Sequence, residues 1–176
     1  DWSGNVLIDT MMNLPLIVWS VQQGDDPALL GVVRGHSEKT IQHVMREDGS
    51  VYHMFRFSPE NGEPVAGDTY QGHAPDTTWS RGQAWAVGGF AMLAHMLNDA
   101  EYLRASERAG AYFLSKLPAD DVPPWDFQAP ADLPYKDASA GAIAGFGFIK
   151  LFDVTGKREY LEAAVRLLSA LAETCA

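Results

Sequence analysis

The stretch from Ser80 to Leu117 reads SRGQAWAVGGFAMLAHMLNDAEYLRASERAGAYFLSKL, and its periodicity decides the fold class. Apolar residues recur every three to four positions, as they do on the buried face of an amphipathic helix. The pattern predicts one helix from Ser80 to Leu97 and a second from Glu101 to Leu117, separated only by a short turn. The sequence therefore predicts a helical hairpin.

This hairpin recurs along the chain. Phe148 stands before Glu159-Tyr160-Leu161 as Phe90 stands before Glu101-Tyr102-Leu103, an offset of 58 residues. Hairpins that repeat at fixed spacing stack, because each needs a neighbour to cover its apolar face. We therefore expect an all-α fold. Two further pairs of helices are predicted, over 139–152 with 158–174 and, as a fainter copy, over 11–23 with 28–46.

Three hairpins alone leave apolar faces at both ends of the stack. A closed ring of six such repeats needs about 350 residues. The chain has 176 residues and starts at Asp1 without an initiator methionine. We therefore expect residues 1–176 to form part of a single domain in a longer protein.

Composition excludes several classes of protein. With 47% apolar and 20% charged residues the chain is not intrinsically disordered. The formal net charge of −10 comes without a basic stripe, so a nucleic-acid partner is not expected. No run of about 18 apolar residues is present, so no membrane partner is expected either. Cys175 is the single cysteine and cannot form an internal disulfide.

The helical pattern is interrupted by a β-like segment and two long loops. Aromatic residues with partial alternation predict a strand over 51–57. The segment 58–75 and the segment 118–134 are rich in proline or glycine and read as irregular. Long loops in a compact domain are usually functional or disordered. The aromatic strand beside the first loop favours a functional one. Loops that connect stacked hairpins gather on one side, so we expect a site there.

The densest polar and aromatic cluster is DTTWSRGQAW at positions 76–85, where a loop enters a helix. Thr78 or Ser80 is the expected helix cap. Arg81 is suited to a carboxylate, and Trp85, one turn later, is suited to stacking on a sugar ring. The spacing alone fits equally well a cap, a surface arginine and core tryptophans.

Three more polar residues qualify as site candidates, each with a structural alternative. Asp9 follows the apolar run Val6-Leu7-Ile8, where a carboxyl group suits general acid catalysis or simply caps a helix. His53 lies on the predicted strand, where most histidines are structural. Gln71 lies in the loop, where simple exposure explains it. No histidine, cysteine and carboxylate pattern has metal-ligand spacing, so no metal is expected.

Taken together, four segments resemble the unsaturated glucuronyl hydrolases of glycoside hydrolase family 88. They are IDTMMNLPL at 8–16, TYQG at 69–72, DTTWSRGQAW at 76–85 and PWDF at 124–127. The related family 105, the unsaturated rhamnogalacturonyl hydrolases, usually shows Ala-Arg-Gly-Asn-Gly-Trp in place of the third segment. Gln83 and Ala84 therefore favour family 88.

The resemblance implies an (α/α)6 barrel and a hydrolase that acts on the 4,5-unsaturated uronic acid left by polysaccharide lyases. It implies that residues 1–176 are the central portion of a glycoside hydrolase catalytic domain. It implies that Asp9 is the catalytic acid and base, and that four residues line the substrate pocket: His53, Gln71, Arg81 and Trp85. A second catalytic aspartate of the family has no counterpart among these residues, so we expect the chain alone to lack a complete active site. No cofactor is implied. By resemblance the enzyme acts in the cytoplasm.

Two alternatives remain open at this point. The first is the family 105 activity on unsaturated rhamnogalacturonan fragments. The second is a non-catalytic carbohydrate-binding or interaction module that has kept the helical fold. The joint presence of Asp9, His53, Gln71, Arg81 and Trp85 argues against the second, because packing alone does not require all five.

Overall fold

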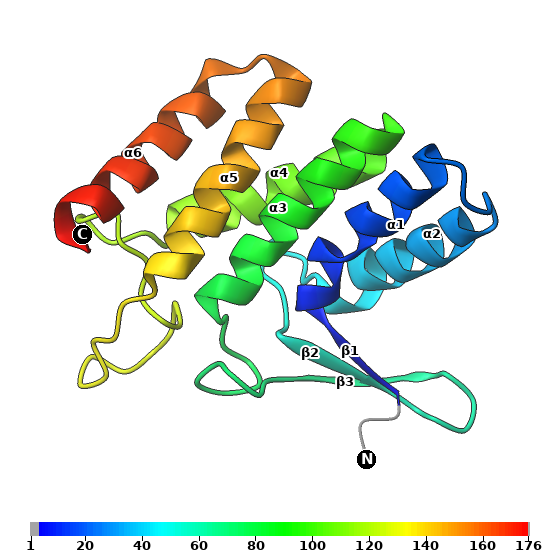
Figure 1. Ribbon diagram of the computed structural model, residues 1–176. Helices are drawn as coiled ribbons and strands as arrows, with labels where there is room; N and C mark the ends of the chain where they lie inside the picture. Colours follow the sequence, from blue (N-terminus) through cyan, green and yellow to red (C-terminus); the bar gives the residue numbers. More distant parts are fainter. Residues whose placement is uncertain (1–3, 176) are drawn as a thin grey trace.

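The computed structural model describes residues 4–175; residues 1–3 and 176, which include the chain start discussed above, lie outside the described part. Three helical hairpins stand in a row, with a small sheet at one end (Figure 1). The hairpins are α1 (Leu14–Gln22) with α2 (Leu29–Lys39), α3 (Ser80–Leu97) with α4 (Ala100–Ser115), and α5 (Ala138–Thr155) with α6 (Arg158–Thr174). The predicted all-α, three-hairpin architecture is confirmed.

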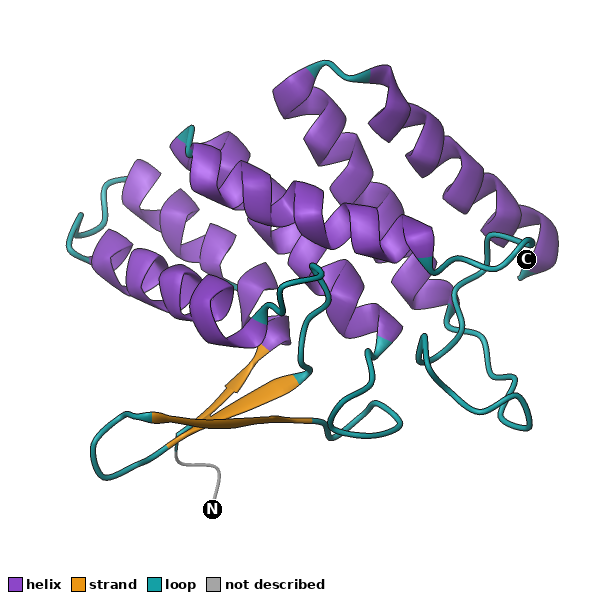
Figure 2. Ribbon diagram, turned by 180° about the vertical axis from the view of Figure 1, so that it is seen from behind, coloured by secondary structure: helices purple, strands orange, loops and turns teal. Residues whose placement is uncertain are grey.

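The helices form two layers, as Figures 1 and 2 show from opposite sides. In one layer α3 packs against both α1 and α5, and in the other α2, α4 and α6 each cover their own hairpin partner. Helices α3 and α5 approach closely because both carry glycine at the crossing. A Cβ atom on Gly147 would lie 2.9 Å from the backbone nitrogen of Gly88.

The 58-residue repeat is also visible in the packing. The rings of Phe90 and Tyr102 join α3 to α4 with 6.2 Å between centroids, and those of Phe148 and Tyr160 join α5 to α6 at 6.3 Å. All four side chains belong to the core or pack against it. The recurring sequence pattern therefore marks the same contact in two successive hairpins.

Helix boundaries differ from the predicted ones where tertiary contacts intervene. The helix predicted from Met11 is divided into a 3₁₀ turn, η1 (Ile8–Met12), and α1, which has Pro15 in its first turn. The helix predicted to run to Arg46 ends in a π-helical turn, η2 (Thr40–Val44). The predicted caps of α3 are wrong: Trp79 occupies that position, without a side-chain hydrogen bond to the helix.

The sheet is larger than predicted. Its antiparallel strands lie in the order β1 (Asn5–Leu7), β2 (Met54–Phe57) and β3 (Pro64–Asp68). Only β2 was expected. The three residues of β1 are too few to show alternation, and β3 contains Pro64, Gly67 and Asp68, which are typical of turns. Both outer strands form because β2 supplies the backbone partners.

The two ends of the row carry exposed apolar side chains. The exposed large apolar side chains of the helices all lie on the first and last hairpins, among them Trp19 and Val32 at one end and Val165 at the other. The expectation of uncovered apolar faces is therefore confirmed for residues 4–175.

Helix α5 is also long and apolar enough to span a membrane, which the sequence analysis did not anticipate. The core helix of a soluble protein passes the same test, and α5 packs between α3 and α6.

Candidate active site

Asp9 lies where the sheet meets the helices. It belongs to η1, directly after β1, and the backbone N–H of Ile8 donates a 3.0 Å hydrogen bond to the carbonyl of His53. This bond extends the β1–β2 pairing by one step and brings the two side chains together. Asp9 does not cap η1, because Leu7 holds that position. Its side chain is 38% exposed and open to a ligand.

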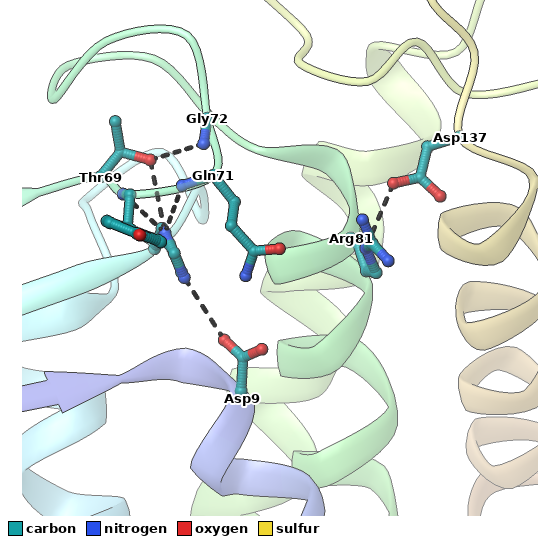
Figure 3. Close-up of polar contacts among 8 residues, drawn as sticks. Asp9, Thr69, Gln71, Gly72, Arg81 and Asp137 are labelled. Atoms are coloured by element: carbon teal, nitrogen blue, oxygen red, sulfur yellow. Dashed lines mark hydrogen bonds and ion pairs between the residues drawn. The ribbon is translucent and has the colours of Figure 1, made fainter.

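His53 faces Asp9 through one ring nitrogen and is held through the other. The backbone N–H groups of Tyr70 and Gln71 both donate to Nδ1 of His53, at 2.9 and 3.1 Å. Because Nδ1 accepts two hydrogen bonds, the neutral ring carries its proton on Nε2. That nitrogen lies 3.7 Å from Oδ2 of Asp9, the contact drawn to Asp9 in Figure 3. The loop thus selects a tautomer that presents an N–H to the carboxyl group.

Burial keeps the His53 ring neutral. The side chain is 1% exposed, and its ring lies 4.6 Å from that of Trp79, centroid to centroid. Loss of hydration lowers the pKa of His53, although the negative charge of Asp9 acts in the opposite direction. A neutral imidazole with a fixed tautomer can donate a hydrogen bond to Asp9 without competing for its proton.

Gln71 joins this pair from the loop that follows β3. Its backbone N–H contacts His53, and its exposed side chain projects into the space between Asp9 and Arg81 (Figure 3). Its carbonyl accepts a 2.7 Å hydrogen bond from the indole N–H of Trp125, which comes from the second long loop. The structure thus brings Asp9, His53 and Gln71 together from three distant segments.

Arg81 lies in the first turn of α3, on the far side of Gln71 from Asp9 (Figure 3). Its Nε atom is 3.3 Å from Oδ2 of Asp137, the residue that caps α5. Its guanidinium group also lies 5.0 Å from the ring of Trp79. The side chain is 37% exposed and lines an open cavity of about 480 Å³. Its outer N–H groups can reach an anion in that space.

Trp85 lies one turn deeper in α3 and is half-buried against the core. Its indole N–H is buried without a hydrogen-bond partner in the described chain. Within residues 4–175 no hydrogen bond, ion pair or ring contact joins Trp85 to the other four candidates, so it is not linked to the Asp9–His53–Gln71 group.

Two polar residues that shape the site, one buried and one half-buried, escaped the sequence analysis. Asp126, 1% exposed, accepts hydrogen bonds from the backbone of His73 and the hydroxyl of Thr77, and so joins the two long loops. Arg46 donates to the carbonyls of Pro75 and Thr77 and holds the same loop from the other side. Charged residues in polar surroundings look solvated in a sequence, so only the PWDF motif hinted at Asp126.

No group of three or more histidine, cysteine or carboxylate side chains within residues 4–175 is placed to hold a metal ion.

Comparison with known proteins shows which proteins the chain is similar to. No protein-family model matches the chain. The unsaturated glucuronyl hydrolase of Bacillus sp. (strain GL1) is 36% identical over 174 residues, covering 96% of this chain and 46% of that protein. An unsaturated chondroitin disaccharide hydrolase of Streptococcus pyogenes serotype M1 is 33% identical over 172 residues, covering 94% and 43%. The chain thus spans about half the length of the curated relatives it matches.

Solved structures show the same relationship. The crystal structure of the Bacillus sp. GL1 unsaturated glucuronyl hydrolase has a TM-score of 0.93 at 36% identity, covering 97% of this chain and 47% of that one. A variant of the Streptococcus agalactiae enzyme, complexed with dGlcA-GalNAc6S, has a TM-score of 0.83 at 30% identity, covering 96% and 46%. In sequence and in fold, nearly the whole chain is therefore similar to the unsaturated glucuronyl hydrolases, which confirms both the resemblance and its helical-hairpin architecture.

Proposed function

We propose that the protein containing this chain releases 4,5-unsaturated uronic acid from the non-reducing end of lyase-generated oligosaccharides. The observation that carries the proposal is the Asp9–His53 pair, a partly exposed carboxyl group facing the N–H of a buried, neutral imidazole at 3.7 Å. Gln71 and Arg81 stand beside this pair, where a uronic acid offers hydroxyl and carboxylate groups. The relatives named for this activity support the same substrate class.

The reaction proceeds by hydration of the vinyl ether. Protonated Asp9 gives its proton to C4 of the C4=C5 double bond, and an oxocarbenium ion forms at C5. The carboxylate of Asp9 then takes a proton from water as the water oxygen bonds to C5, which returns Asp9 to its starting state. The resulting hemiketal opens to a ketone at C5, and the hemiacetal left at C1 expels the second sugar. One water molecule is consumed, and one carboxyl group serves both steps.

Each of the other candidates has a separate task. His53, fixed as the Nε2–H tautomer, orients the carboxyl group of Asp9 and stabilises it after the proton has left. Arg81 binds the substrate carboxylate through its outer N–H groups. Gln71 hydrogen-bonds the sugar hydroxyls, and Trp85, one turn further along α3, supplies an apolar ring surface for the sugar.

Replacement of Asp9 by asparagine tests the proposal in the protein at its full natural length. Asn is nearly isosteric but has no proton to give, so turnover should fall by about 10²-fold or more while substrate binding persists. Turnover is followed as the loss of absorbance of the conjugated double bond. The exposed Asp76→Asn in the neighbouring loop is the matched control and should keep its activity.

Two measurements define the result that would contradict the proposal. Near-wild-type turnover by Asp9→Asn would remove Asp9 from the chemistry. In D₂O the wild-type protein should place deuterium at C4, whereas solvent oxygen at C1 without deuterium at C4 would indicate conventional hydrolysis. Faster turnover of unsaturated rhamnogalacturonan than of unsaturated chondroitin disaccharide would favour the family 105 activity instead.

A further inference from the structure

The loop that follows β3 fixes the tautomer of His53, so whatever holds this loop in place matters to the candidate site. The backbone N–H groups of Tyr70 and Gln71 donate to Nδ1 of His53 at 2.9 and 3.1 Å. If the loop moved away, both hydrogen bonds would be lost and the proton of the neutral ring would be free to occupy Nδ1. The position of the loop therefore decides whether His53 faces Asp9 with an N–H group.

Asp126 of the second long loop holds the loop after β3 through a side chain that is 1% exposed. Its Oδ2 atom accepts hydrogen bonds from the backbone N–H of His73 at 3.0 Å and from the hydroxyl of Thr77 at 2.8 Å. Its Oδ1 atom accepts the backbone N–H of Gln128 at 2.9 Å. Burying a carboxyl group costs free energy unless hydrogen bonds compensate it. Here the compensating donors come from both loops, so the side chain connects them.

Backbone hydrogen bonds on both sides of Asp126 join it to the start of α3. The N–H of Ser80 donates to the carbonyl of Trp125 at 3.1 Å. The N–H of Phe127 donates to the carbonyl of Thr78 at 3.0 Å. Because α3 also carries the arginine of the candidate site, Asp126 ties the loop after β3 to the same helix that presents this arginine.

Glycine at position 72 allows the carboxyl group to come this close to the loop. A Cβ atom on Gly72 would lie 3.0 Å from Oδ2 of Asp126 and 2.7 Å from Oγ1 of Thr69. The Oγ1 atom of Thr69 accepts the N–H of Gly72 at 2.8 Å and lies 3.5 Å from Nδ1 of His53 (Figure 3). A continuous set of contacts therefore leads from Asp126 through the TYQG segment to the imidazole.

We propose that Asp126 is a positioning residue, whose carboxyl group holds the loop after β3 so that His53 presents its Nε2–H group to Asp9. The consequence for turnover rests on the proposed function, whereas the tautomer of His53 can be observed without substrate. Both oxygens of Asp126 face N–H donors, so the residue must accept hydrogen bonds on both sides. Asp126→Asn would place an NH₂ group opposite the N–H of either His73 or Gln128, and one contact would be lost.

The first test observes the tautomer directly, in the protein at its full natural length labelled with ¹⁵N-histidine. Long-range ¹H–¹⁵N NMR spectra distinguish protonated from unprotonated ring nitrogens, and the His53 signals are assigned by their absence from His53→Gln. At about pH 8, above the usual histidine pKa of about 6.5, the wild type should show the Nε2–H tautomer. Asp126→Asn should show a mixture of tautomers. Asp132→Asn, the same change at an exposed residue of the second long loop, is the matched control and should resemble the wild type.

The second test connects the tautomer to the chemistry, with unsaturated chondroitin disaccharide as substrate. Asp126→Asn should lower kcat by about tenfold, because an imidazole that carries its proton on Nδ1 cannot donate to Asp9. The KM should change by no more than about twofold, because Arg81 still binds the substrate from α3. A residue that only stabilised the fold would lower the melting temperature and leave both the tautomer and kcat of the folded protein unchanged.

Each outcome separates this inference from the proposed function. A folded Asp126→Asn protein that keeps the wild-type tautomer or the wild-type kcat would overturn the inference and leave the proposed function intact. A wild-type protein without turnover would refute the proposed function, while the NMR comparison would still decide whether Asp126 sets the tautomer.

A milder variant decides the question if Asp126→Asn does not fold. Thr77→Val removes the hydroxyl that donates to Oδ2 of Asp126 and should shift the tautomer of His53 in the same direction. Thr77→Ser keeps the hydroxyl and is its matched control. An unchanged tautomer in folded Thr77→Val would then overturn the inference.

Discussion

Gln83 stands in the middle of the family-specific RGQAW motif, yet it points into the core rather than into the site. It is fully buried in α3, and its amide connects three segments. Its Oε1 atom accepts the backbone N–H of Val51 at 2.9 Å, and its Nε2 atom donates to the carbonyls of Gly49 and Ala109 at 2.8 and 3.0 Å. We therefore expect Gln83→Met, which keeps the shape and removes the amide, to destabilise the fold strongly.

The size of the effect depends on which hydrogen-bonding partners of Gln83 are left without another partner. The carbonyl of Ala109 lies within α4 and keeps its helical hydrogen bond. The N–H of Val51 and the carbonyl of Gly49 lose the Gln83 amide in a buried setting, and each such group costs about 1–3 kcal/mol. The free energy of unfolding should therefore fall by about 2–6 kcal/mol.

Chemical denaturation of the protein at its full natural length measures this change, as a lower midpoint with an unchanged slope. Ser106→Ala is the matched control in the same hairpin. Ser106 is equally buried but donates a single bond, to the carbonyl of Val87, which retains its partner within α3. That variant should lose about 1 kcal/mol. A Gln83→Met protein no less stable than Ser106→Ala would refute the reasoning.

Two further predictions concern the candidate site. Arg81→Lys keeps a positive charge but loses the planar guanidinium group that binds a carboxylate through two N–H groups. Turnover of the charged substrate, measured by steady-state kinetics, should therefore fall about tenfold or more. Unchanged kinetics would make Arg81 a surface residue paired with Asp137. Burial lowers the pKa of His53 in the folded protein below its usual 6.5. Between this lowered pKa and pH 6.5, His53 is therefore protonated in the unfolded chain but not in the folded one. Stability should therefore decrease as the pH falls below about 6.5, and denaturation at several pH values should show a smaller decrease for His53→Gln than for the wild type.

The hairpins could be predicted because their signal is local. Amphipathic periodicity within Ser80–Leu97 and Ala100–Ser115 depends on residues three and four positions apart, and the Phe90–Tyr102 contact repeats at Phe148 and Tyr160. Where the helices begin and end was predicted less well. The π-helical turn at Thr40–Val44 and the 3₁₀ turn before Leu14 depend on neighbouring segments that a local pattern does not contain.

The candidate site could be nominated from the resemblance but not from spacing. Asp9, His53 and Gln71 lie far apart in the sequence, and each has an ordinary structural explanation when taken alone. They meet because Leu7 pairs with Met54 and Ile8 bonds to His53, and because the loop after β3 brings Gln71 back over the ring. Neither β1 nor β3 has a strand signal in the sequence. The strand pairing that brings Asp9 next to His53 could therefore not be predicted from the sequence.

The RGQAW motif shows why a family-specific block is not the same as a list of site residues. Arg81 faces the cavity and Asp137, whereas Gln83, two positions later, is turned to the core and ties down the segment from Gly49 to Val51. That segment leads directly to His53. A residue that is turned away from the candidate site can therefore be as specific to it as one that faces it, because Gln83 holds the segment that leads to His53, directly before β2. Gln83 and Arg81 therefore support the same candidate site from opposite sides of helix α3.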